Sequence, residues 1–250
     1  MPEVAGLRYT LKKLLLLRWS LPSDLTERAR RILNDLPPVP VGEKDGEMVL
    51  LPAAEFDLKK NTENPELYCV FPYRLFGVGK PDLDLAKRTF ARRLHVEHTC
   101  WHQDVIQMAL LGMTAEAQDF ISRRAADECH SDSRFPAFWN AFHDWVPDID
   151  HGGVLQIALQ FMLVQCDGRQ IRLLPAWPAE WDADFKLHVP GPAVIEGRVP
   201  PRQSGALGRH PGKPDSGYHR RPGVTAATCQ ARSQPVKYSA RIVRGVAQLG

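Results

Sequence analysis

Several common signatures of function are missing from this 250-residue sequence. Its five cysteines are scattered, odd in number and never spaced as CxxC, so neither a disulfide framework nor a zinc site is predicted. The sequence has no phosphate-binding loop, no dinucleotide fingerprint and no nucleophile elbow. We therefore expect no cofactor and no resident metal, and hydrolysis by carboxylates is the catalytic chemistry that remains.

Long apolar runs are missing as well. The longest purely aliphatic run near the start, Leu14 to Leu17, is too short for a signal-peptide core. It is also far below the roughly 20 residues that span a membrane. We expect a soluble chain, cytoplasmic and without a membrane partner, although export of full-length relatives stays open.

Acidic residues are scarce in one part only. Residues 199–250 hold nine Lys and Arg against one acidic residue, whereas residues 1–198 hold 23 basic and 28 acidic residues. An acidic body argues against binding to nucleic acid, because phosphate contacts need clustered Lys and Arg on the folded domain. The tail is rich in Gly and Pro and has no sustained hydrophobic period, which predicts disorder. A basic arm that binds nucleic acid or an anionic surface is the functional alternative.

The hydrophobic pattern predicts a mainly α fold. Apolar residues recur at helical spacing in segments at 7–15, 25–36, 64–71, 81–94, 101–111, 114–126 and 154–166. The last segment is apolar on nearly every side, which is typical of a helix buried in a helical toroid. A hairpin or extended loop is expected at 41–51, and alternation after Asp167 predicts short β-strands. The predicted organisation is a helical toroid segment at 1–166, a β appendage at 167–198 and a disordered basic tail at 199–250.

The segment richest in reactive groups is FPAFWNAFHDWVPDIDHGG, residues 135–153, with three Asp, two His and several aromatic rings. Pro147 and two glycines interrupt helical structure on both sides, so Asp148, Asp150 and His151 should lie on an irregular loop. Loops of this kind often carry functional residues. The alternative is that Asp150 only caps the helix that follows and that Asp148 is a solvated loop residue.

Two further groups of carboxylates, amides and aromatic rings open predicted helices. They are Glu66 and Tyr68 in NPELY, and Trp101, His102, Gln103 and Asp104 in CWHQD. Such groups can bond the hydroxyls of a neutral sugar and pack against its ring, so a carbohydrate is the expected partner. Trp101, Trp139 and Trp145 are candidate stacking platforms, although core packing is the more frequent role of any one of them.

Three segments together resemble glycoside hydrolase family 95. They read NPELYCVFPYRLFG at 64–77, CWHQDVIQMALLG at 100–112 and DIDHGGVLQIALQFMLVQCDGRQIRLLPAWP at 148–178. In that family an acidic loop and a Gly-Gly pair enter a buried helix, which is followed by a turn and a LLPALP strand. The order and spacing of the three segments are similar to the family's, and a bacterial subgroup in which they recur together is the nearest resemblance.

The resemblance implies an (α/α)6 toroid that hydrolyses a terminal α-linked sugar, such as L-fucose, with inversion. It implies that Asp148 helps to activate the attacking water, and it places the general acid, a Glu, before Met1. The chain is thus expected to be the C-terminal part of a longer catalytic domain, in which Asp150, Glu66 and Asp104 hold hydroxyls or tune the base. Two alternatives stay open. One is an inactive or carbohydrate-binding remnant, and the other is a helical interaction scaffold.

Overall fold

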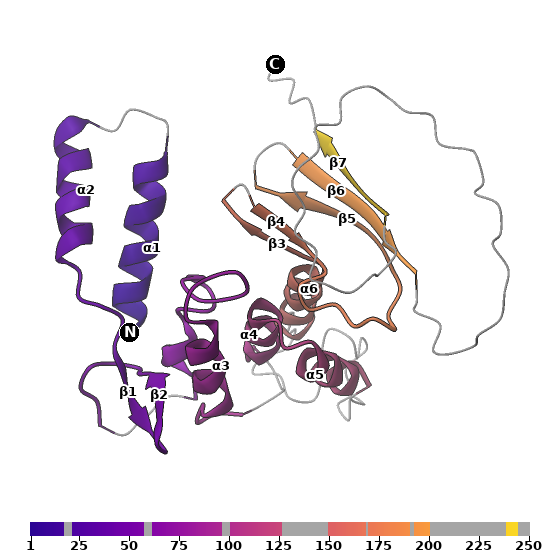
Figure 1. Cartoon of the computed structure of the whole chain (residues 1–250), viewed down its shortest axis with the longest axis horizontal. Coiled ribbons are helices and arrows are strands. Elements are labelled where there is room, and N and C mark those ends of the chain that lie inside the picture. Colours follow the sequence, from indigo (N-terminus) through magenta and orange to yellow (C-terminus); the bar gives the residue numbers. More distant parts are fainter. Residues whose placement is uncertain are drawn as a thin grey trace, which may run out of the picture. The chain divides into compact units, whose positions relative to one another are not determined.

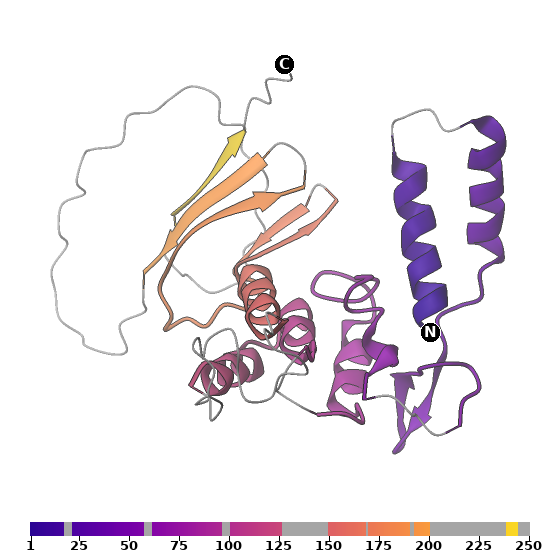
Figure 2. The same ribbon diagram turned by 180° about the vertical axis from the view of Figure 1, so that it is seen from behind.

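The computed structural model describes residues 1–17, 22–57, 62–96, 101–126, 150–168, 170–190 and 193–200, and the backbone of 239–244. The chain divides into two compact units, Met1–Phe161 and Met162–Gly250. Figure 1 and Figure 2 show the elements of both units from opposite sides.

The first unit opens with a helical hairpin. Helices α1 (Pro2–Leu16) and α2 (Ser23–Asp35) pack side by side, as both views show (Figure 1, Figure 2). The Arg8 guanidinium donates hydrogen bonds to the carbonyls of Leu36 and Pro37, at 3.3 and 2.8 Å, and so ties α1 to the chain that leaves α2. The predicted pair of N-terminal helices is confirmed.

A small hairpin follows. Strands β1 (Val41–Lys44) and β2 (Glu47–Leu50) pair in antiparallel register through a two-residue turn. Both turn residues, Asp45 and Gly46, have positive φ, which matches the twist of a tight hairpin. The buried face of β2 packs on α3 (Leu83–Ala91), where the backbone N–H of Leu50 donates to the Thr89 hydroxyl at 2.8 Å.

The rest of the first unit is built around α3. It contacts the short 3-10 helix η1 (Pro65–Leu67) and α4 (Asp104–Leu111), and α4 in turn packs on α5 (Thr114–Ala126). All eight residues of α4 are buried. The helix ends at Gly112, whose left-handed backbone closes the last turn, as the sequence predicts.

The boundary between the two units falls within helix α6 (Asp150–Leu163), and the second unit is mostly β-structure. Strands β3 (Val164–Asp167) and β4 (Gln170–Leu173) form a hairpin. Strands β5 (Ala183–Val189), β6 (Ala193–Val199) and β7 (Ser239–Arg244) form an antiparallel sheet in that order (Figure 1). Leu163, Val164, Val189 and Ile195 form its apolar core.

The prediction of a mainly α toroid with a β appendage is wrong. The described residues form six α-helices and three small antiparallel sheets, so the fold is mixed. The hairpin β1–β2 interrupts the helices because its two-residue turn and buried face favour pairing over helix. The predicted helix at 64–71 is only a 3-10 turn, and the one at 154–166 ends at Leu163 because the next residues pair with β4. Residues 239–244, assigned to the disordered tail, form β7.

No helix within the described ranges is both long enough and apolar enough to cross a lipid bilayer.

Candidate functional site

The acidic loop that dominates the sequence analysis lies largely outside the described residues. Asp148, the predicted base, and Trp145 are both outside them, as is the side chain of His151. Asp150 is the first residue of α6 and is exposed. A carboxylate in the first turn of a helix interacts favourably with the helix dipole, so this position fits the alternative in which Asp150 stabilises the start of α6.

Glu66 lies on η1 and is almost completely buried, with 6% of its surface exposed. The turn forms because Pro65 presets the first helical φ and because the carbonyl of Asn64 accepts the N–H of Leu67 at 2.9 Å. The Cys69 thiol donates to the Glu66 carbonyl at 3.1 Å and fixes the residue from the other side. These two hydrogen bonds fix the backbone of Glu66. The burial of its side chain is unusual, because Glu is seldom buried in proteins.

The Glu66 side chain lines a cavity of about 210 Å³. Its apolar walls come from β2, from the segment after it and from the segment after α3, and include Leu51, Phe56 and Leu94. At about 30 Å³ for each water of bulk liquid, the volume equals that of roughly seven waters, enough for one small ring. The cavity therefore offers apolar surface and one buried carboxylate to a small ligand.

Two positively charged side chains, Lys44 and Arg92, also line the cavity. Lys44 donates from Nζ to the carbonyl of Arg92 at 2.7 Å, and Nη1 of Arg92 lies 2.9 Å from Oε2 of Glu47. An ammonium has three N–H donors and a guanidinium five, so each side chain has more donors than these contacts use. Asp57 also lines the cavity. The cavity is thus lined by hydrogen-bond donors, acceptors and apolar side chains. Its two cations, Lys44 and Arg92, are balanced by two carboxylates, Asp57 and Glu66.

The helix α4 begins with a buried ion pair. Nε of Arg93 lies 2.5 Å from Oδ1 of Asp104, and their side chains are 8% and 3% exposed. The guanidinium also lies 3.8 Å from the centroid of the Phe90 ring and donates to the Phe90 carbonyl at 2.7 Å. Burial raises the pKa of the Asp104 carboxyl above its ordinary value, while the Arg93 charge opposes that rise. Oδ1 of the Asp104 carboxylate is thus bound to Arg93.

The remaining predicted residues have other neighbours. The ring of Trp101 stacks on that of His102, with centroids 4.5 Å apart and planes inclined by 18°. Tyr68 donates its hydroxyl to Oε2 of Glu63 at 2.5 Å, and burial, followed by this bond, raises the pKa of that hydroxyl. Gln103 precedes α4 and is half-buried. Of the predicted site residues that the structure describes, Glu66 alone lines the cavity.

The structure nevertheless brings two of the predicted groups to one segment, residues 92–95. Asp104 of the CWHQD group binds Arg93, and Asn64, the first residue of NPELY, bonds the backbone of His95. The sequence analysis missed Arg93, Asn64 and the two cavity cations, Lys44 and Arg92. No local pattern points to them, because their partners lie between 11 and 48 residues away in the chain.

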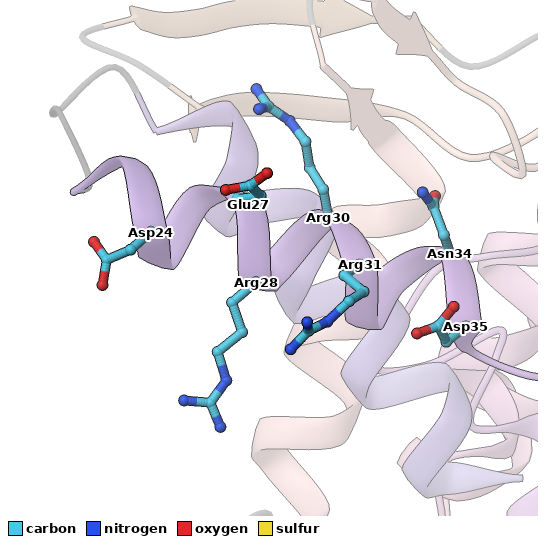
Figure 3. A pocket seen from close by; sticks show the side chains of 7 residues that line it. All are labelled: Asp24, Glu27, Arg28, Arg30, Arg31, Asn34 and Asp35. Carbon is cyan, nitrogen blue, oxygen red and sulfur yellow. The ribbon is translucent and has the colours of Figure 1, made fainter.

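A second hollow, on α2, does not resemble a binding site. Seven residues line it and all belong to this one helix, which carries both charge signs there. Figure 3 shows the labelled side chains spreading away from the helix in different directions rather than converging on a common point. Within the described ranges, no three His, Cys, Asp or Glu side chains gather as metal ligands either.

No protein-family model matches this sequence, and no curated protein matches it.

Proposed function

We propose that this chain is a glycoside hydrolase domain that acts on a terminal α-linked, fucose-like sugar, and that the cavity beside β2 holds the sugar ring. The observation that carries the proposal is the burial of the Glu66 carboxylate in a cavity that also offers Lys44, Arg92 and apolar walls. A sugar ring has hydroxyls that both donate and accept hydrogen bonds, and C–H surfaces that pack on apolar groups.

The proposed chemistry is inverting hydrolysis. Asp148 removes a proton from the attacking water, and a second carboxylic acid protonates the leaving oxygen. The two carboxyl groups of inverting enzymes are roughly 6.5 to 9.5 Å apart, which leaves room for the water between them. In this proposal Glu66 accepts a hydrogen bond from a ring hydroxyl, and the cavity cations donate to ring oxygens.

Carbohydrate binding without turnover is the second candidate. It is favoured by the lining of the cavity, because Glu66, Lys44 and Arg92 can bond sugar hydroxyls whether or not Asp148 acts on a water. Asp104, paired with Arg93, then stabilises the first unit, and its effect on a sugar is indirect.

Binding of L-fucose, followed by titration calorimetry, tests the sugar site. Glu66→Gln keeps the shape of the side chain and removes its charge. We expect it to weaken binding about tenfold, because a neutral hydrogen bond replaces one to a charged group and the two differ by roughly 1 to 1.5 kcal/mol. Glu55→Gln removes an exposed charge from the segment that follows β2, at a position that does not line the cavity, so it should bind as the wild type does.

Turnover of 4-nitrophenyl α-L-fucoside separates the two candidates. Release of nitrophenol, with a product of inverted configuration by proton NMR, supports the hydrolase. Binding without release supports the binding module, and absence of binding refutes both and favours an interaction scaffold.

A further inference from the structure

One wall of the cavity is a short segment whose alternate residues face different neighbours. Arg92 and Leu94 line the cavity. Arg93, between them, binds Asp104 at the start of α4, and His95 is bound through its backbone to Asn64. The contacts of Arg93 and His95 therefore fix the position of the cavity wall that Arg92 and Leu94 form.

The link to Asn64 uses both atoms of the side-chain amide. Nδ2 donates to the carbonyl of His95 at 2.8 Å, and Oδ1 accepts the backbone N–H of His95 at 3.1 Å. Asn64 is 7% exposed, and the two hydrogen bonds are partly buried. A planar amide can pair with the N–H and C=O of one residue in this way, whereas a carboxylate lacks the donor and an aliphatic side chain lacks both groups.

Asn64 is connected to two sides of the cavity. Glu66 follows it by two residues, and Leu94 immediately precedes its partner His95. The carbonyl of Asn64 also accepts the N–H of Leu67, which starts the turn that carries Glu66. The paired bonds to His95 therefore set the distance between the buried carboxylate and the apolar wall.

We propose that Asn64 is a positioning residue of the sugar site, which acts on the ligand by fixing Glu66 relative to Leu94 and Arg92. Asn64 itself does not line the cavity. The inference rests on the proposed function, since it assigns Asn64 a role in the affinity for the same sugar.

Asn64→Asp is the most informative variant because it is nearly isosteric and its effect depends on pH. The ionised carboxylate can still accept from the N–H of His95 but repels its carbonyl, so the wall shifts. The protonated carboxyl can donate again and restores the pair. We expect affinity for L-fucose about tenfold below that of the wild type at about pH 7.5, the loss of roughly one hydrogen bond. We expect it to approach the wild type at about pH 4.5, because burial beside a carbonyl raises the pKa of the new carboxyl.

The measurement is the ratio of variant to wild-type affinity at each pH, by calorimetry on protein shown by circular dichroism to be folded. Asn34→Asp, at an exposed position of α2, introduces the same charge away from the cavity and should show a ratio near one at both pH values. Asn64→Leu removes both hydrogen bonds and should show no recovery at low pH.

Folded Asn64→Asp protein that binds L-fucose as tightly as the wild type at both pH values overturns the positioning role and leaves Asn64 with a purely structural one. In that case the proposed function stands if Glu66→Gln still loses affinity. A wild-type protein that does not bind L-fucose overturns the proposed function and this inference together.

Discussion

Replacing Arg93 by Met should leave the Asp104 carboxylate buried without its guanidinium partner. Both side chains are more than nine-tenths buried, so water cannot replace the lost partner. Breaking a buried pair in this way costs about 3 to 5 kcal/mol. The Met side chain keeps part of the packing on Phe90 but loses the hydrogen bond to its carbonyl, at 2.7 Å in the wild type. We therefore expect the lost charge, rather than lost packing, to account for most of the effect.

The matched control is the double variant Arg93→Met with Asp104→Leu, in which neither charge is present. Replacing a whole buried pair with apolar groups of similar size is often close to neutral. The double variant should therefore be more stable than Arg93→Met alone. Urea denaturation, followed by circular dichroism at 222 nm, gives the free energies, and an unchanged slope shows that the surface exposed on unfolding is the same.

The pH dependence of the free energy of unfolding gives an independent check on the role of the Asp104 charge. Burial raises the pKa of Asp104 in the folded protein, so protonation favours the folded state and the associated stability is lost as pH rises through the folded pKa. Without Arg93 the pKa should rise further, and Arg93→Met should regain stability relative to the wild type as the pH falls from 7 toward 5. A cost below about 1 kcal/mol at pH 7, or a deficit that does not change with pH, would refute the reasoning, since that is what an exposed ion pair gives.

Three further predictions concern other parts of the chain. Burial raises the pKa of the Cys69 thiol to about 12, so iodoacetamide at pH 8 should label it far more slowly than half-buried Cys166, as mass spectrometry would show; equal rates would contradict its burial. Gly197→Ala places a Cβ 2.5 Å from the Phe185 ring, and displacing the ring should lower the free energy of unfolding by about 1 to 3 kcal/mol; an unchanged urea midpoint would show that the ring moves freely. A chain ending at Pro200 loses β7 and exposes the edge of β6, so light scattering should show association that increases with concentration, and a strictly monomeric truncated chain would contradict it.

Much of the local structure follows from short stretches of sequence. The helices of the N-terminal hairpin and α5 have the predicted positions, because apolar spacing acts over a few residues. The expected hairpin at 41–51 and the end of the helix at residue 111 are also confirmed, since the turns that follow depend on backbone conformations that few residues adopt easily. The alternation after Asp167 correctly predicts the strands β4 and β5.

The candidate site could be predicted only in part. The pattern NPELY singles out Glu66, but no property of its neighbours shows that it lies in a cavity with Lys44 and Arg92. The CWHQD pattern singles out Asp104 as a group that binds sugar hydroxyls, whereas the structure shows its carboxylate paired with Arg93. A carboxylate has the same sequence signature in both roles, because its partner is chosen by packing.

The sequence by itself determined where most helices and strands form, because helical and strand periods, glycine turns and caps act between residues that are close in the chain. Only the tertiary structure decided the fold class, the cavity and the paired hydrogen bonds between Asn64 and His95, which are 31 residues apart. The pairing of β7 with β6 is of the same kind. Contacts of this range depend on which apolar surfaces can be buried together after the intervening chain closes, and a buried polar group then takes the partner that this packing leaves beside it.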